Sequence, residues 1–192
     1  MRELSLNARL LRFFIDQDPG VGRIKLAKYA YLADLISVKL CRQPISEFRY
    51  IFDNHGPFDS ARFYSALEEL KDEAFVTERT KIKWRREYEY TTTEAVLDYR
   101  FSEVEEEILS FTVSTYRPYT ATALNKDVVY KTAPMLIAER KQPVQLDVVL
   151  KAAPDPLDFS VERLLAGEKS VRLGRHRPIE EAMRELRAKY RT

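Results

Sequence analysis

The segment 22–40 constrains the fold more than any other part of the chain, because it is apolar on nearly every side. A narrow polar stripe runs through Lys25, Lys28 and Asp34 at helical spacing. A helix that is apolar nearly all round is buried on several sides. Its charges interrupt the run of about 20 apolar residues that a membrane span needs. We therefore expect a central core helix with other elements packed around it.

Further helices are predicted before and after this central segment. Ser5 is suited to cap the first of them, and Ser102 followed by Glu105 has the pattern of a capping box. Asp59 or Ser60 stands at the cap position of the helix that follows the central one. We expect helices over 5–15, 59–71, 121–129 and 132–140, another after Ser102, and either a strand or a helix start over 144–150. The inner face of the helix over 59–71 is expected to consist of Phe63, Tyr64, Leu67 and Leu70.

The clearest strand pattern lies between residues 81 and 90. Apolar and aromatic residues share one face and charged residues the other, which is typical of a half-exposed antiparallel strand. Residues 74–77 are its expected partner, with the turn near 78–80. A helix followed by such a hairpin has the outline of a winged helix. The predicted fold is therefore mainly α with a small β-hairpin, an α+β protein with a winged-helix-like helical core.

The 192 residues suit one domain with an appendage. We expect the domain to span 1–150 and a linker followed by an amphipathic tail, a C-terminal helical extension, to span 151–192. Short amphipathic segments of this kind fold against a partner or pack back on their own domain, and both alternatives stay open. The candidate partner-binding residues of the tail are Phe159, Leu164, Arg172, Arg175, Met183 and Leu186.

Residues that carry most metal and acid–base chemistry are scarce. The chain has two histidines and one cysteine, far apart in the sequence, whereas zinc sites need clustered ligands. Cys41 is expected to pack as a small apolar side chain, and His55 to hydrogen-bond within the turn before Gly56. No phosphate-binding glycine loop or nucleophile motif occurs. We therefore expect no metal, no cofactor and no enzymatic activity.

The charge pattern also bears on compartment and partners. Charged residues interrupt every apolar stretch at the N-terminus, and a single cysteine forms no internal disulfide. These features favour a cytoplasmic protein without a membrane partner. The net charge of +2 is too close to balance to require nucleic acid.

DNA is nevertheless an alternative partner, because basic residues cluster in the predicted hairpin. They are Lys81, Lys83, Arg85 and Arg86. On a wing these side chains would contact the phosphate backbone, or another partner, while on an edge strand they would only keep the sheet from aggregating. The helix over 59–71 carries several acidic residues, which repel phosphates.

Four short stretches together resemble the Panacea domain, also called the SocA-like antitoxin domain. They are the Lys-Leu-Ala-Lys-Tyr-Ala-Tyr-Leu-Ala-Asp run at 25–34, the Arg-Tyr pair at 49–50, the His-Gly-Pro-Phe turn at 55–58 and the Phe-Tyr-Ser-Ala-Leu run at 63–67. The resemblance covers about residues 22–76. His55 stands where the family more often has an aromatic residue, and Tyr29 replaces an aliphatic one.

The resemblance implies an antitoxin from a prokaryotic or phage toxin–antitoxin pair, which neutralises its toxin by direct protein contact. One alternative is an adaptor that delivers a partner to a protease, and another is a winged-helix transcription regulator. The family brings no catalytic residues, and its shared motif residues have a structural role. In this chain they are Lys25, Tyr31, Asp34, His55, Gly56 and Pro57.

Overall fold

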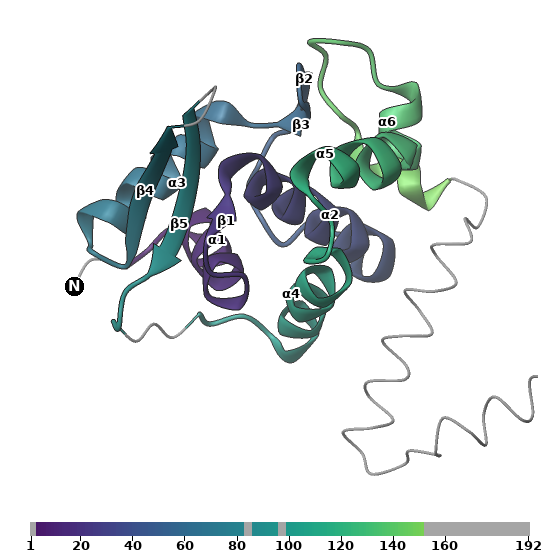
Figure 1. Cartoon of the computed structure of the whole chain (residues 1–192). Coiled ribbons are helices and arrows are strands. Elements are labelled where there is room, and N and C mark those ends of the chain that lie inside the picture. Colours follow the sequence, from purple (N-terminus) through teal and green to yellow (C-terminus); the bar gives the residue numbers. More distant parts are fainter. Residues whose placement is uncertain (1–2, 83–85, 96–98, 152–192) are drawn as a thin grey trace, which may run out of the picture. The chain divides into compact units, whose positions relative to one another are not determined.

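The computed structural model describes residues 3–82, 86–95 and 99–151, all within a compact unit that spans Met1–Ala152. This unit is mostly helical and contains two small antiparallel sheets (Figure 1). The expected α+β class is thereby confirmed. Among the described residues, no helix has the length and apolar character that crossing a membrane requires.

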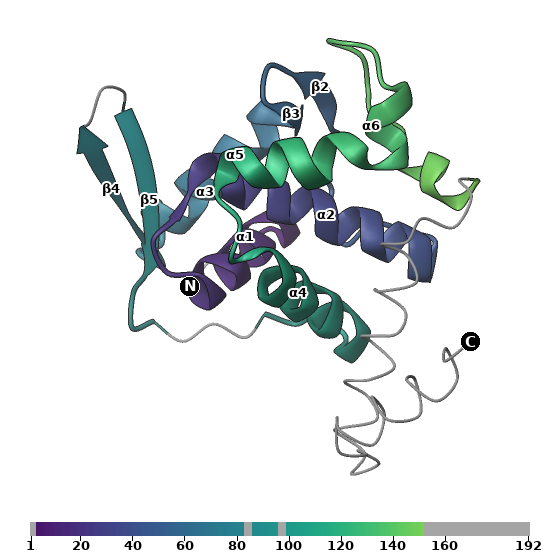
Figure 2. The ribbon, with the colours of Figure 1, turned by 45° about the vertical axis from the view of Figure 1, so that its right-hand side comes forward.

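The central helix is α2 (Arg23–Cys41), and the other helices pack around it. It contacts α1 (Leu6–Gln17), α4 (Glu103–Tyr116) and the short helical segments of the C-terminal part (Figure 2). The expected core helix is therefore confirmed. The expected polar stripe does not face solvent, because Lys28 and Asp34 are buried and make hydrogen bonds inside the protein.

The larger sheet has the strand order β1–β5–β4, formed by Val21–Gly22, Arg86–Thr92 and Val76–Ile82. The hairpin is longer than expected. The turn predicted near 78–80 is wrong, because these residues belong to β4 and pair with 88–90 of β5. A hydrogen bond between Thr77 and Thr91 and an ion pair between Lys81 and Glu89 stabilise the longer pairing.

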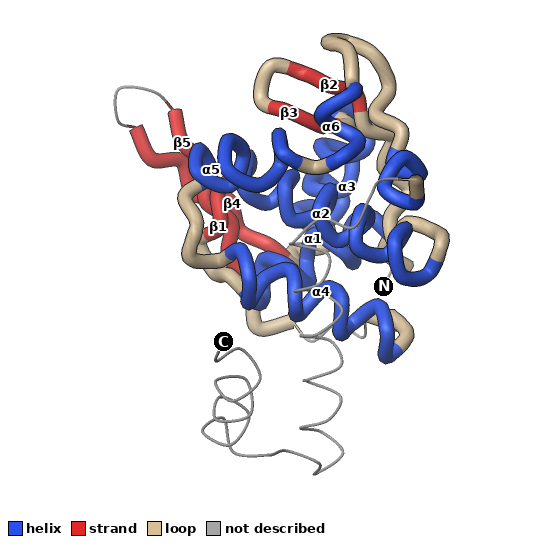
Figure 3. Tube along the Cα trace, turned by 90° about the vertical axis from the view of Figure 1, so that its right-hand side faces the viewer, coloured by secondary structure: helices blue, strands red, loops and turns tan. Residues whose placement is uncertain are grey.

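A second, two-stranded sheet pairs β2 (Ile51–Asp53) with β3 (Gly56–Phe58). The two sheets lie at separate edges of the helices (Figure 3). Helix α3 (Ser60–Asp72) follows, and the Asp59 side chain accepts a hydrogen bond from the Arg62 amide at its start. Tyr64 is 40% exposed, so its placement on the inner face was wrong. Its ring faces the Arg23 guanidinium instead.

The C-terminal part of the domain is a chain of short helical segments. Helix α4 begins at the predicted capping box of Ser102 and Glu105. The helix expected over 121–129 is present as a run whose hydrogen-bond pattern changes along its length. Its segments are α5 (Ala121–Ala123), the π-helix η1 (Leu124–Val128) and the 3-10 helix η2 (Val129–Lys131). Helix α6 (Ala133–Ile137) ends before the expected residue 140, and 144–150 contains the 3-10 helix η3 (Leu146–Leu150).

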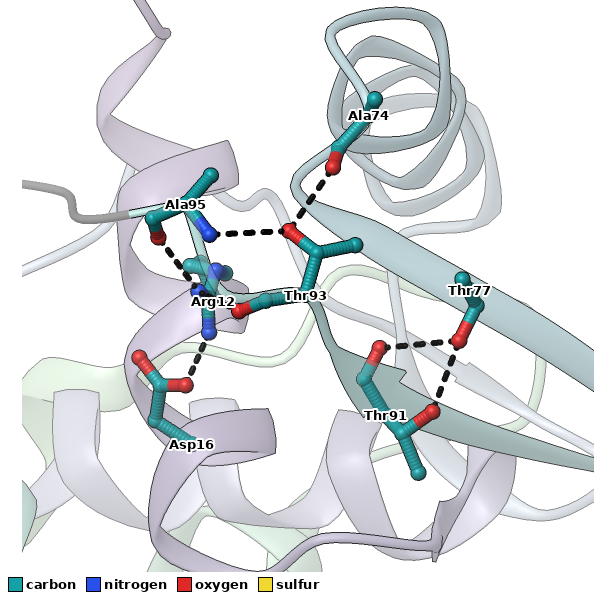
Figure 4. Close-up of polar contacts among 7 residues, drawn as sticks. All are labelled: Arg12, Asp16, Ala74, Thr77, Thr91, Thr93 and Ala95. Carbon is teal, nitrogen blue, oxygen red and sulfur yellow. Dashed lines mark hydrogen bonds and ion pairs between the residues drawn. The ribbon is translucent and has the colours of Figure 1, made fainter.

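A buried arginine joins α1 to the end of the hairpin. Arg12, only 3% exposed, donates hydrogen bonds to the carbonyls of Thr93 at 3.3 Å and Ala95 at 3.1 Å (Figure 4). It also pairs with Asp16 one turn along α1. Thr93 in turn donates to the carbonyl of Ala74, at the start of the hairpin. One side chain therefore holds the first helix against the strand pair.

Removing this arginine is expected to destabilise the domain. Arg12→Ala leaves two carbonyls and a carboxylate without their donor, and we expect a loss of about 2–3 kcal/mol of unfolding free energy. Urea denaturation followed by circular dichroism measures the change. The control is Arg49→Ala, whose exposed side chain should contribute less than about 0.5 kcal/mol. Equal losses in the two variants would contradict the role of Arg12.

Candidate functional site

Asp34 is the most extensively hydrogen-bonded side chain of α2. Its carboxylate is fully buried and accepts hydrogen bonds from the amides of Ile45 at 2.9 Å and Ser46 at 2.8 Å. The hydroxyls of Ser46 and Tyr50 donate to its other oxygen. Burial raises the pKa of Asp34, and these four hydrogen bonds oppose that rise. The carboxylate thereby fixes the loop between α2 and β2 to the central helix.

Tyr31, almost one turn before Asp34, connects α2 to the C-terminal part of the domain. Its hydroxyl lies 2.8 Å from Oγ1 of Thr132, the residue that precedes α6. Because the Thr132 hydroxyl donates to the carbonyl of Val129, Tyr31 is the donor to Thr132. The ring of Tyr31 also meets that of Tyr50 edge to face, with centroids 5.3 Å apart. Burial raises the pKa of Tyr31.

Lys28 is a buried cation with few partners. Its side chain is 1% exposed, and among the described residues its only hydrogen bond is from Nζ to the carbonyl of Pro57, at 3.0 Å. Burial lowers the pKa of Lys28 to about 7, an effect that the charge of Asp53 partly opposes. From the sequence, Lys28 was expected only as part of a polar stripe on this helix. A lysine on an otherwise apolar helix was the available signal for a special role.

The turn that receives Lys28 depends on a glycine. Gly56 has φ +90°, a left-handed conformation that side chains other than glycine rarely adopt. A Cβ at this position would lie 2.8 Å from Oδ1 of Asn125 and 3.1 Å from Nζ of Lys28. The Oδ1 atom of Asn125 is buried without a hydrogen-bond partner. The missing side chain therefore allows α2 and η1 to approach the turn closely.

A cavity of about 560 Å³ opens beside this turn. It is bordered by the first turns of α2, the β2–β3 turn, α3 and β5. Its lining includes three basic side chains of α2, namely Arg23, Lys25 and Lys28, and the aromatic rings of Phe58, Tyr64 and Tyr88. The motif residues Lys25 and His55 both reach this cavity, so the structure brings part of the sequence motif together around it.

The basic side chains of the cavity differ in their surroundings. Lys25 pairs with Asp18 at 3.2 Å and donates to the carbonyl of Arg117. The guanidinium of Arg23 lies over two aromatic rings, 4.5 Å from the centroid of Tyr88 and 5.5 Å from that of Tyr64. Within the described ranges Arg23 makes no ion pair, and the faces of the two rings are the direct contacts of its charge.

Two expectations for single side chains were wrong. His55 is exposed and makes no hydrogen bond to any described residue, because the turn is closed by the pairing of β2 with β3 and by Lys28. Cys41 is exposed rather than packed, because the last turn of α2 extends beyond the core. Among the described residues, no group of three or more His, Cys, Asp or Glu side chains is placed to hold a metal ion.

The predicted contact residues of the hairpin and the tail are only partly within the described structure. Lys81 lies on β4, and its Nζ is 2.6 Å from Oε1 of Glu89, so its charge is neutralised across the hairpin. Arg86 stands in β5 opposite Ile82. Outside the described residues lie Lys83, Arg85, Phe159, Leu164, Arg172, Arg175, Met183 and Leu186. Their proposed contacts stay predictions.

An apolar surface on α6 was not expected from the sequence. Leu136 is 70% exposed and Ile137 is 63% exposed, and the two are adjacent at the end of this short helix. Leu150, at the end of η3, is 36% exposed, and η3 packs against α6. We call Leu136, Ile137 and Leu150 the α6 patch. The short apolar run 135–137 gave no indication of which side chains would face solvent.

Gly56→Ala is expected to lower the unfolding free energy by about 2–4 kcal/mol, since it combines a left-handed backbone with a steric overlap. Gly20→Ala is a matched control, because Gly20 has φ +84° but no atom within 4 Å of the added Cβ. This control should cost only about 1–2 kcal/mol. Chemical denaturation measures both variants. If both variants lost the same unfolding free energy, the close approach of Lys28 and Asn125 to the turn would not contribute to the cost of Gly56→Ala.

Lys28 should make stability depend on pH. Burial lowers the pKa of Lys28 in the folded protein to about 7 from the ordinary lysine value of 10.5, so above neutral pH the unfolded chain binds more protons than the folded one. The unfolding free energy therefore rises as the pH increases from about 7 to about 9. We expect Lys28→Met to remove much of this rise in urea denaturation, and the exposed Lys126→Gln to retain it. An unchanged slope in Lys28→Met would contradict the prediction.

Comparison with known proteins identifies the family of the chain. A family model described as the antitoxin SocA-like, Panacea domain matches residues 26–132, which is more than half of the chain. Neither the curated proteins nor the solved structures give a match. The matched range includes α2 from Leu26 onward, the Gly56–Pro57 turn, the hairpin and α4. The chain therefore belongs to the antitoxin SocA-like, Panacea domain family.

Proposed function

We propose that this protein is an antitoxin that neutralises a cognate toxin by direct protein–protein contact. The observation that carries the proposal is the family match over residues 26–132, which covers most of the central helix and most elements packed against it. A non-enzymatic role agrees with the family. Binding of a toxin requires only a surface of suitable shape and chemistry, and no catalytic group.

The α6 patch is our candidate for the toxin-contacting surface. Leu136 and Ile137 are the most exposed of the large hydrophobic side chains in the described structure. Contiguous exposed apolar side chains mark protein-interaction sites, because their burial against a partner releases water. The hydrogen bond between Tyr31 and Thr132 attaches the start of α6 to the central helix α2, and this attachment holds the α6 patch in position. The tail over 151–192 is a second candidate for toxin contact.

A winged-helix transcription regulator is the second candidate function. Apart from the β2–β3 hairpin between α2 and α3, the element order α1, β1, α2, α3, β4, β5 is that of a winged helix, and the strand order β1–β5–β4 agrees with it. Two observations weigh against DNA contact. Helix α3, in the position of a recognition helix, carries Glu68, Glu69 and Asp72, and Lys81 on the hairpin is already paired with Glu89. We therefore favour the antitoxin role.

The test begins with purification of the tagged full-length chain from its native cells, with and without nuclease. A stoichiometric protein that survives nuclease is then expressed alone and together with this chain. Growth arrest by the partner, relieved by co-expression, would support the antitoxin role. A partner without toxicity would overturn that role, and nucleic acid released by nuclease would favour the regulator.

The contact surface is tested with the same pair. The double variant Leu136→Glu and Ile137→Glu should weaken toxin binding at least about 30-fold, the loss typical of a binding hot spot, and abolish rescue of growth. Val104→Glu is the matched control, because Val104 is 49% exposed but lies at the start of α4, away from the α6 patch. Removal of residues 159–192 tests the tail. Full rescue by the double variant would exclude the α6 patch.

A further inference from the structure

We propose that the cavity at the start of α2 is a binding site for a small organic anion with an aromatic ring, such as an aromatic phosphate or carboxylate. Its anionic group would bind near Lys28, Arg23 and the first turn of α2, and its ring would pack against Phe58, Tyr64 and Tyr88. The site is independent of the proposed toxin contact, because none of the α6 patch residues lines the cavity.

Lys28 is the strongest indication of an anionic ligand. A protonated lysine has three N–H donors, whereas its only acceptor among the described residues is the neutral carbonyl of Pro57. The side chain is 1% exposed, so solvent does little to satisfy the other donors. The charge of Asp53 offsets only part of the cost of burying a protonated lysine, and a ligand anion that reaches Nζ would lower that cost further.

The beginning of α2 adds to the positive potential of the cavity. Gly22 at the N-cap provides no side chain to cap the helix, and the first turn contains no acidic residue. Gly22, Arg23, Ile24 and Lys25 all line the cavity, so the positive end of a 19-residue helix opens into it. The positive end of the helix would add to the attraction of an anion, whose charge would be balanced chiefly by Lys28 and Arg23.

Three acidic side chains line the cavity, Asp53, Glu87 and Glu89, and two of them are paired with lysines that do not line it. Asp53 pairs with Lys141, and Glu89 pairs with Lys81 at 2.6 Å. Glu87 also lines the cavity and has interactions of its own. By contrast, Arg23 has no ion pair with any described residue. The cations that remain for a ligand are therefore Arg23 and Lys28.

The size and the walls of the cavity indicate the rest of the ligand. About 560 Å³ lies within the range of pockets that hold small molecules, roughly 300–1,000 Å³. Tyr64 and Tyr88 already offer their faces to the planar guanidinium of Arg23, and Phe58 packs edge to face with Tyr64. A flat ring would pack against Phe58 and against the parts of Tyr64 and Tyr88 that Arg23 leaves uncovered. An anionic group attached to a ring matches both parts of the lining.

The test is calorimetric titration of phenyl phosphate into the full chain. We expect one binding site with Kd below about 1 mM, and phenol or inorganic phosphate alone to bind at least tenfold more weakly. Titrations near pH 8 in two buffers of different ionisation enthalpy should reveal proton uptake, because the anion favours charged Lys28. Absence of binding would overturn the proposal. The proposal would also be overturned if an acetylated Tyr-Asp dipeptide bound more tightly than phenyl phosphate. That result would indicate that the cavity receives side chains of a partner protein.

Variants separate the site from non-specific attraction. Arg23→Gln and Lys28→Met should each weaken binding at least about tenfold, and Lys28→Met should also abolish proton uptake. Lys126→Gln removes an exposed charge that does not line the cavity and should leave affinity unchanged. Ala121→Leu fills part of the cavity without changing its charge and should weaken binding. If Lys28→Met fails to fold, Ala121→Leu and Arg23→Gln still test the site. Unchanged affinity in both of these variants would overturn the proposal.

Discussion

Two opposite charges buried on one helix organise the domain around α2. Asp34 is satisfied by four hydrogen bonds, which hold the following loop against the helix. Lys28, on the preceding part of the helix, is satisfied only by the Pro57 carbonyl and requires the glycine turn to approach closely. Burial penalises each charged form, so the surrounding segments are held where their polar groups meet these side chains. The fully satisfied aspartate stabilises the fold, whereas the incompletely satisfied lysine leaves capacity for a ligand.

The features predicted correctly from sequence are those set by local chemistry. The length and burial of α2 follow from its apolar residues, and the cap at Ser5 and the capping box at Ser102 follow from residues a few positions apart. The hairpin turn was misplaced because both arms carry charged residues in alternation, and only pairing across the strands selects a register. The cavity could not be predicted, because its walls come from segments about 65 residues apart, such as Arg23 and Tyr88. Exposure at Leu136 and Cys41 depends likewise on where neighbouring elements end.

The cavity and the α6 patch are attached to the same stretch of α2. Lys28 faces the glycine turn, and three residues later Tyr31 donates to Thr132, immediately before α6. The two surfaces therefore share a rigid, buried support while presenting different chemistry, one cationic and aromatic and the other aliphatic. This arrangement allows either surface to change in sequence without loss of the core.

The buried arginine of α1 bears on how the chain is made. Arg12 leaves the ribosome before its carbonyl partner at Thr93, which is synthesised 81 residues later. Until then Asp16 is the only one of these partners that the guanidinium can bind, and the first helix has no strand pair to pack against. A nascent chain that stops before the hairpin is complete thus leaves open the side of α1 that packs against β5, although α2 and α3 are already available to cover its other sides. Completion of the second strand closes this side of the first helix to chaperones and proteases.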